Sequence, residues 1–221
     1  MKKLPGLLAL ITLLACFTAC KKMAADLPPA LPATSAINVV NATADTINTF
    51  QNGTRFNITS SFYPGGSLGY VEVVAGEQQY QIKKAGTPIV LLSLPLTLDT
   101  NKAYSFFIAG NSAERAFLIN DVFLANNDVE IRFVNASPDR SFDIKIADNF
   151  NFSNKAFKSA TQFVKMTAGK VRYEIYKTGE TTAVLSGDIT LATNRVYTLF
   201  TKGTATGTGD AAFGVKLIAN R

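Results

Sequence analysis

The stretch Ile37–Asp45, INVVNATAD, returns 94 residues later as Ile131–Asp139, IRFVNASPD. β-Branched and aromatic residues fill its first part and turn-forming residues close it, which is typical of a strand that ends in a tight turn. Two later blocks repeat in the same order at an offset of 93: Ala75–Ile82 matches Ala168–Ile175, and Leu98–Gly110 matches Leu191–Gly203. A repeat at a nearly fixed offset predicts two copies of one structural unit.

The repeat divides the protein into two predicted domains, residues 36–127 and 128–221. Each is about 90 residues long, which is enough for a small independent domain. The junction Ala125–Asp128 is short, so we expect the two domains to touch. The preceding residues, 20–35, contain Pro28, Pro29 and Pro32 and show no strand alternation. They predict an extended tether that could span about 45 Å.

Short segments of alternating polarity predict that each copy is a β-sandwich. In the second copy Val171, Tyr173 and Ile175 alternate with two charged residues, as expected of a strand with one buried face. Six more strands are predicted in this copy, over Val129–Asn135, Phe142–Ala147, Thr161–Thr167, Ala183–Leu191, Val196–Thr201 and Phe213–Ala219. Seven short strands per copy favour an all-β protein of two tandem immunoglobulin-like antiparallel sandwiches.

Several repeated residues are predicted to serve the fold. Tyr104 and Tyr197 each close the pattern Leu-x-Thr-Asn-(Lys/Arg)-x-Tyr. They are candidates for a tyrosine corner, in which the hydroxyl bonds to upstream backbone, or for ordinary core tyrosines in a hairpin. The other structural candidates are turn residues at matching positions of the two copies: Asn41, Asn135, Asp45 and Asp139.

The ordered motifs Val-Asn-Ala-(Ser/Thr)-x-Asp, Ala-Gly-x-x-x-Tyr and Leu-x-x-x-(Lys/Arg)-x-Tyr resemble the bacterial domain of unknown function 4397. The resemblance covers nearly all of residues 36–221 as two tandem copies. The first copy departs from the pattern at Ala44, where the second has Pro138. The resemblance implies an exported β-sandwich and brings no catalytic residues.

The first 19 residues resemble a bacterial lipoprotein signal peptide of the Bacteroidetes type. Two lysines precede the apolar run Leu4–Ala19, and Cys20 follows it before Lys21-Lys22. The resemblance implies a diacylglyceryl thioether on Cys20, with Cys16 as the alternative. The competing interpretation is an uncleaved membrane helix, for which the run is short. We therefore expect an exported protein, lipid-anchored to the outer membrane and facing the periplasm or the surface.

The amino-acid composition limits the catalytic mechanisms and the partners that the protein can have. The sequence contains no histidine, which excludes Ser-His-Asp catalysis and most catalytic zinc sites. Carboxylate pairs among Asp139, Asp143 and Asp148 could support glycoside hydrolysis, although repeated Asp139 is more simply a turn residue. The net charge is +6 without a concentrated basic stretch, so nucleic acid is an unexpected partner. We expect no metal and no cofactor.

Aromatic residues near turns are the remaining binding candidates. Tyr63, next to Pro-Gly-Gly, is predicted to be exposed and could stack on a sugar ring. Phe150, Phe152 and Phe157 lie near the matching place in the second copy. Phe150 and Phe152 have strand spacing and are therefore expected to belong to the core. Asp45-Thr46-Ile47 resembles a Bacteroidetes O-glycosylation acceptor, which leaves open whether Thr46 is modified.

These observations favour a lipid-anchored cell-envelope protein with a non-catalytic structural, adhesion or binding role. Its expected partners are the membrane, through the lipid, and a glycan or another envelope protein. The alternatives are a glycan-binding accessory lipoprotein and, less favoured, a carboxylate-based hydrolase.

Overall fold

The computed structural model describes residues 31–58, 60–123, 128–147 and 149–220. Residues 33–221 form one compact unit that contains both copies of the repeat. The predicted signal peptide, with Cys16 and Cys20, and most of the predicted tether lie outside the described residues.

The first repeat is a sandwich of two four-stranded sheets. The sheet that faces the other repeat, here called the inner sheet, has the order β4-β1-β7-β8, and the sheet on the far side, the outer sheet, has the order β3-β2-β5-β6. The strands are β1 (Thr34–Asn41), β2 (Ile47–Gln51), β3 (Thr54–Arg55), β4 (Ser67–Val74), β5 (Gly76–Lys84), β6 (Val90–Leu98), β7 (Ala103–Ile108) and β8 (Ala116–Asp121). A 3-10 turn, η1 (Ala113–Arg115), precedes β8.

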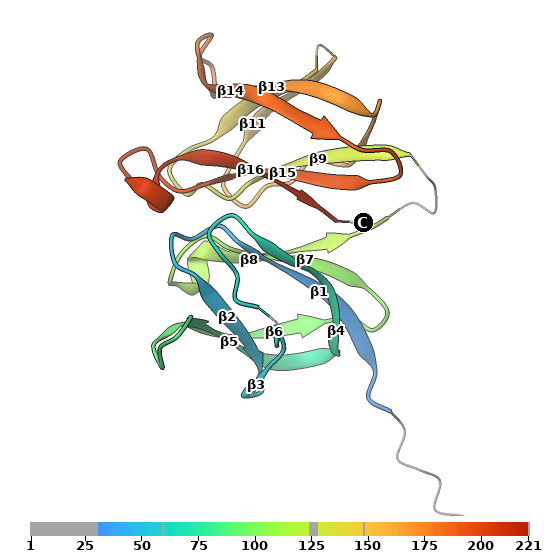
Figure 1. Ribbon diagram of the computed structural model, residues 1–221, viewed down its shortest axis with the longest axis vertical. Helices are drawn as coiled ribbons and strands as arrows, with labels where there is room; N and C mark the ends of the chain where they lie inside the picture. The colour runs from blue at the N-terminus through green and yellow to red at the C-terminus, as the bar shows by residue number, and fades with distance from the viewer. Residues whose placement is uncertain (1–30, 59, 124–127, 148, 221) are drawn as a thin grey trace, which may run out of the picture. The chain divides into compact units, whose positions relative to one another are not determined.

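The second repeat has the same topology, with an inner sheet β12-β9-β15-β16 and an outer sheet β11-β10-β13-β14 (Figure 1). Its strands are β9 (Val129–Asn135), β10 (Phe142–Ile146), β11 (Phe150–Lys155), β12 (Val164–Met166), β13 (Gly169–Lys177), β14 (Ala183–Leu191), β15 (Val196–Lys202) and β16 (Gly214–Ala219). A 3-10 turn, η2 (Gly209–Ala211), lies between β15 and β16. The predicted all-β class with two sandwich-like domains is confirmed.

Two details differ from the predicted sandwich. The antiparallel pattern is broken once in each repeat, because β1 pairs with β7 in parallel and β9 pairs with β15 in parallel. The second repeat also has a strand outside the seven predicted ones, β11, in the segment that holds Phe150 and Phe152. Both phenylalanines point to the same side of β11 and pack against the core, as their spacing predicts.

Each sandwich has its own apolar core between its two sheets. In the first repeat Ile37 and Val39 of β1 point into this core, and in the second repeat Ile131 and Phe133 of β9 do the same; all four are fully buried. Complete burial of such side chains stabilises a fold by about 1.5–3 kcal/mol each. The alternation of these strands therefore accounts for one buried face of each inner sheet.

The opposite faces of the inner sheets are also buried. Every residue of β9 and β15 is buried, as is nearly every residue of β1 and β7. A third apolar cluster joins the repeats: Phe107 of β7 stacks on Phe117 at 5.2 Å between ring centroids and meets Phe200 of β15 edge-on at 5.6 Å. Phe157 of the second repeat contacts Phe117 across this interface, with 5.8 Å between the ring centroids. The two sandwiches thus pack inner sheet against inner sheet.

Candidate functional site

A buried ion pair joins the two inner sheets beside this apolar cluster. Arg132 lies in the middle of β9, and Asp121 is the last residue of β8. Arg132 Nη1 lies 2.6 Å from Asp121 Oδ1, and the two side chains are 3% and 0% exposed. A buried ion pair is tolerated only when further hydrogen bonds compensate both charges for lost water.

The guanidinium of Arg132 has such partners. Its Nε donates to Thr198 Oγ1 at 3.0 Å, and its Nη2 donates to Ser105 Oγ of the other repeat at 3.1 Å. Its flat face lies over the ring of Phe163, 4.6 Å from the centroid, where a cation–π interaction is favourable. All three guanidinium nitrogens are therefore occupied.

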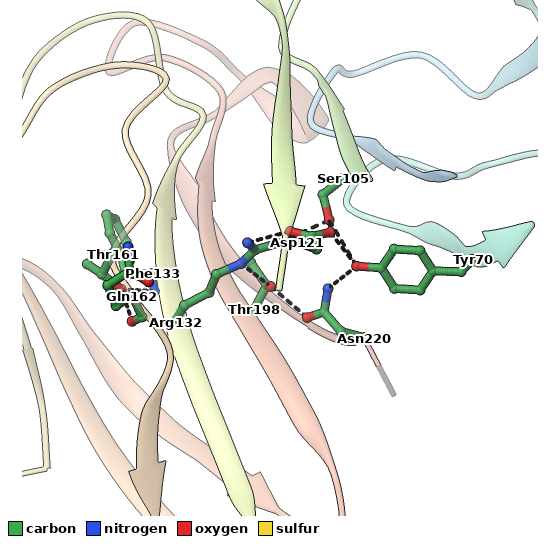
Figure 2. A network of polar contacts seen from close by, with 9 residues as sticks. All are labelled: Tyr70, Ser105, Asp121, Arg132, Phe133, Thr161, Gln162, Thr198 and Asn220. Carbon is green, nitrogen blue, oxygen red and sulfur yellow. Dashed lines mark hydrogen bonds and ion pairs between the residues drawn. The ribbon is translucent and has the colours of Figure 1, made fainter. Parts of the chain in front are cut away.

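The carboxylate of Asp121 is held in the same way. Its Oδ2 accepts hydrogen bonds from Ser105 Oγ at 2.7 Å and from the hydroxyl of Tyr70. The Tyr70 hydroxyl in turn accepts from Asn220 Nδ2 at 3.1 Å, and Asn220 Oδ1 accepts from Thr198 Oγ1 at 2.6 Å. Figure 2 shows the resulting closed network between the two inner sheets.

The network favours a structural role over a catalytic one. Burial, and then the charge of Asp121, raises the pKa of Tyr70, so its hydroxyl stays protonated and serves as a donor. Perturbed titratable groups often mark active sites. Here, however, the charged atoms of Arg132 and Asp121 point at each other and at neighbouring side chains, and neither residue is open to solvent. The cluster thus fixes one sandwich on the other.

The predicted turn residues Asn41 and Asn135 make equivalent contacts at the ends of β1 and β9. Asn41 Nδ2 donates to the carbonyls of Asp45 and Phe62 at 2.7 and 3.1 Å. Asn135 Nδ2 donates to two carbonyls of its own repeat, both at 2.9 Å. In both turns the side-chain oxygen accepts the backbone N–H two residues on, at 3.0 Å. Each asparagine is fully buried and replaces missing backbone partners.

Asp45 and Asp139 share a repeat position but not a partner. Asp45 Oδ1 lies 2.7 Å from Lys84 Nζ in a partly exposed ion pair, a kind that contributes little to stability. Asp139 Oδ2 accepts the backbone N–H of Ala205 at 2.6 Å. The two carboxylates therefore tie their turns to different neighbours.

The two tyrosines of the repeated pattern bond to backbone upstream. The Tyr104 hydroxyl accepts the N–H of Asp99 at 3.2 Å, and the Tyr197 hydroxyl accepts the N–H of Ala192 at 2.9 Å. Both side chains are buried, and both bonds reach back five residues across a turn. This is the arrangement of a tyrosine corner.

The carboxylates considered for hydrolysis are engaged with backbone. Asp143 accepts the N–H of Asn154 at 2.6 Å and that of Gly179 at 3.0 Å, and these two bonds lower its pKa. A general acid in glycoside hydrolysis needs a raised pKa instead. Asp143 therefore fits a structural role, as does Asp139, while Asp148 lies outside the described residues.

Tyr63 lies on a well-held turn between β3 and β4. Its side chain is 72% exposed, and Ile58 on the same connection is 79% exposed. The turn is fixed because Gly65 donates to Asn41 O at 2.7 Å. Gly65 has a positive φ, and a Cβ there would lie 2.6 Å from the side chain of Lys216 in β16. The turn thus presents an apolar surface from a rigid support.

Sequence reasoning did not predict Arg132, Asp121 or Ile58 as notable residues. A charged residue inside a strand normally points to solvent, so Arg132 has no distinguishing mark in the sequence. The signal that could have revealed the interface is the run Phe106-Phe107-Ile108, which has no polar residue to face water.

The order of the repeated motifs agrees with one family of domains. The model of the family described as Domain of unknown function (DUF4397) matches residues 35–139 and 129–221, and the chain belongs to this family. The two matched regions are consistent with the two repeats. No curated protein matches the sequence.

Three solved structures are similar at low identity. A family 26 carbohydrate-binding module of Eubacterium rectale Amy13K, solved with maltoheptaose, is 9% identical over 82% of this chain and 95% of its own, with a TM-score of 0.26. A candidate cell adhesion protein of Parabacteroides distasonis ATCC 8503 is 10% identical over 85% and 98%, with a TM-score of 0.25. The Bacillus anthracis TIE protein is 8% identical over 78% of this chain, which spans 33% of that protein, with a TM-score of 0.26. These scores are too low to carry a functional argument.

Membrane-spanning helices and metal clusters are both missing from the part of the protein that the structure describes. There, no helix has the length and apolar character needed to cross a membrane. Within the same residues, no three His, Cys, Asp or Glu side chains are grouped so that they could hold a metal ion.

Proposed function

We propose that the chain is an exported, lipid-anchored cell-envelope protein with a non-catalytic structural, adhesion or binding role. The observation that carries the proposal is the interface between the repeats. Its apolar cluster and its buried ion pair join two sandwiches through their inner sheets, so the loops of both are held in one fixed arrangement. A fixed arrangement of loops on a rigid scaffold suits a contact surface.

The chemistry of the described residues supports a role without catalysis. The buried charges of Arg132 and Asp121 hold the two sandwiches together, and the carboxylates of Asp139 and Asp143 accept hydrogen bonds from backbone N–H groups. Exposed contact features lie instead on a turn, at Tyr63 and Ile58.

In this proposal the parts of the protein have separate tasks. Residues 1–19 direct export, Cys20 carries the lipid, and residues 20–35 form the tether. The domains over 36–127 and 128–221 then stand away from the outer membrane, facing the periplasm or the surface.

The anchoring half of the proposal is tested with the full-length protein, tagged at its C-terminus, in a Gram-negative host. We expect the wild type to enter the detergent phase on Triton X-114 partition and Cys20→Ser to stay in the aqueous phase. Cys16→Ser is the matched control and should behave as the wild type. A wild type in the aqueous phase, or loss of anchoring in Cys16→Ser alone, would contradict the assignment.

Protease treatment of intact cells then decides the side of the membrane. Digestion of the anchored protein in unbroken cells indicates surface exposure, whereas protection until the outer membrane is opened indicates the periplasm. Either result directs the search for a partner, to glycans and surfaces in the first case and to envelope proteins in the second.

Glycan binding is the second candidate function, and Tyr63 is the observation that favours it. A tyrosine that is 72% exposed on a turn offers a flat apolar face to a sugar ring. In affinity electrophoresis against a panel of polysaccharides, retardation by one of them should disappear in Tyr63→Ala and survive in Tyr63→Phe. No retardation by any polysaccharide, or full retardation of Tyr63→Ala, would refute this candidate.

A further inference from the structure

The polar network between the repeats is built from equivalent positions of the two copies. On the inner sheet of the first repeat, Asn38 of β1 pairs with Ser105 of β7. On the inner sheet of the second repeat, Arg132 of β9 pairs with Thr198 of β15 in the same register. Asn38 therefore corresponds to Arg132, and Ser105 corresponds to Thr198.

The edge strands extend this correspondence on one side. Ser105 pairs with Ile119 of β8, and Asp121 follows two residues later. Thr198 pairs with Ile218 of β16, and Asn220 follows two residues later. Asp121 therefore corresponds to Asn220.

The correspondence also holds on the other side of the inner sheets. Asn38 pairs with Tyr70 of β4. On the second repeat Val164 of β12 pairs with the residue before Arg132, so the position opposite Arg132 is Phe163. Tyr70 therefore corresponds to Phe163.

The apolar half of the interface is paired in the same way. Four pairs of its residues match between the repeats: Val40 with Val134, Ala42 with Ala136, Phe107 with Phe200, and Ile119 with Ile218. Phe117 is an exception, because its counterpart on β16 is Lys216. An interface formed by the same patch on both partners is the isologous arrangement of a twofold dimer. The two repeats thus pack about a pseudo-twofold axis within one polypeptide.

The polar positions break this symmetry. At these four positions the first repeat has a carboxylate and no cation, whereas the second has a guanidinium and no carboxylate; the residues are Asn38, Tyr70, Ser105 and Asp121 against Arg132, Phe163, Thr198 and Asn220. The buried carboxylate of Glu130 lies on β9 outside these positions. Two faces of the first kind would bury two carboxylates, and two of the second kind would bury two guanidinium groups. Uncompensated buried charge is strongly unfavourable.

One atom marks where the symmetry is broken. Asn38, at the position equivalent to Arg132, is fully buried, and its Nδ2 has no hydrogen-bond partner among the described residues. The ion pair is thus formed on one side of the pseudo-axis only.

We propose that the inner-sheet face of the first repeat is a docking surface whose partner is a domain of the second kind, and that it rejects its own kind. The matched apolar residues fit either partner, because they are the same in both repeats, whereas Phe117 and its counterpart Lys216 differ. The four exchanged polar positions supply the selectivity. A protein made this way pairs its own unlike repeats in preference to the like repeats of another copy.

The test grafts one face onto the other within the full-length protein. The double-carboxylate variant carries Arg132→Asn, Phe163→Tyr, Thr198→Ser and Asn220→Asp, so both faces are of the first kind. The double-guanidinium variant carries Asn38→Arg, Tyr70→Phe, Ser105→Thr and Asp121→Asn, so both faces are of the second kind. The mirrored variant carries all eight substitutions and restores unlike faces in the opposite order.

Thermal unfolding gives the readout. We expect Tm to fall by about 6–12 °C in the double-carboxylate and double-guanidinium variants, because each buries like charges. The mirrored variant should return to within about 4 °C of the wild type, although it contains every substitution of both destabilised variants. General damage from the substitutions would add up in the mirrored variant, so recovery there measures complementarity alone.

A control exchanges equivalent residues away from the interface. On the outer sheets Lys83 Nζ lies 4.5 Å from the ring centroid of Phe50, and Lys145 Nζ lies 5.1 Å from that of Tyr176. The double change Lys145→Phe and Tyr176→Lys gives the second repeat the phenylalanine and lysine that the first repeat has at the equivalent positions. It should leave Tm nearly unchanged.

Two results would overturn the proposal. If the mirrored variant is as unstable as the double-carboxylate or double-guanidinium variant, or does not fold, the selectivity does not lie in the four positions. If both of those like-charged variants unfold at the wild-type temperature, the four positions do not discriminate between partners.

Discussion

Phe107 is the residue whose removal should separate the two repeats. It is fully buried in β7 and contacts Phe117 of its own repeat and Phe200 of the other. Phe106, its neighbour on the same strand, is equally buried but points into the core of the first repeat. The pair therefore compares the interface with a domain core at constant side-chain volume.

The size of the effect follows from burial. Truncation of a fully buried phenylalanine to alanine costs about 3–5 kcal/mol, which includes the loss of aromatic contacts worth about 0.5–1.5 kcal/mol each. Phe107→Ala and Phe106→Ala should therefore lower the free energy of unfolding by similar amounts. A domain of ordinary stability has about 5–15 kcal/mol, so both variants should still fold.

The two variants should differ in which strands become less protected. Hydrogen exchange read by mass spectrometry should show faster exchange in β9 and β15 of the second repeat for Phe107→Ala, because these strands lose their cover. Phe106→Ala should raise exchange mainly in β2 and β5, since the interface persists while the first repeat is folded. Phe107→Ala should also split urea unfolding into two transitions.

The reasoning would be refuted by exchange in β9 and β15 that is unchanged in Phe107→Ala. A loss below about 1 kcal/mol would refute it as well, because that value is too small for a phenylalanine that carries an interface. Equal effects of both variants on the second repeat would indicate that the repeats unfold as one unit whatever happens to their contact.

Three further predictions concern the rest of the fold. Tyr197→Phe removes the acceptor for the Ala192 N–H and should cost about 1 kcal/mol in chemical unfolding, whereas Tyr63→Phe on the exposed turn should cost almost nothing. Burial raises the pKa of Tyr80 to about 12. The stability that its protonated side chain contributes to the fold is therefore complete below about pH 10 and is lost as pH rises towards 12. In a series of Tm measurements at increasing pH, Tyr80→Phe should reduce this alkaline loss of stability. Two backbone N–H groups hold the pKa of Asp143 below its ordinary value. The stability that its ionised carboxylate contributes is therefore present above about pH 4 and is lost as pH falls below that. If Asp143→Asn loses Tm at acid pH to the same extent as the wild type, this reasoning is contradicted.

The strands of the outer sheets could be predicted from the sequence, because one of their faces is exposed to solvent and their residues therefore alternate in polarity. In β14, exposed and partly buried residues alternate along nearly the whole strand, and its predicted bounds, Ala183–Leu191, agree with the structure. The repeat itself predicted the tandem arrangement, since a recurring motif order indicates a recurring fold. The alternation of polar and apolar residues therefore identifies strands that are buried on one face only.

The interface was not readable in the same way. Alternation assigns one face of a strand to solvent, and it gives Arg132 that face because a charge normally seeks water. The structure buries the second face of β9 under another sheet, where Arg132 meets a carboxylate from a strand that ends at Asp121. Such a pairing depends on how two domains dock, and no local pattern within either strand encodes it. Pairing between β1 and β7 in parallel is hidden for the same reason, because it joins the ends of the repeat.

Comparison of the two repeats with each other separates residues that serve the fold from residues that serve contact. Asn41 and Asn135 remain the same because each closes the turn after its strand by donating to backbone carbonyls of its own repeat. The interface positions differ in a correlated way, since a carboxylate on one face is useful only against a cation on the other. The outer sheets show the same correlated change. In the first repeat Lys83 lies over the ring of Phe50, and at the matching positions of the second repeat Lys145 lies over the ring of Tyr176. The lysine and the aromatic residue have exchanged places, and the cation–π contact is kept. A constant position thus serves backbone geometry at Asn41 and Asn135 and apolar packing at Phe107 and Phe200, whereas positions that change in pairs report which polar side chains touch.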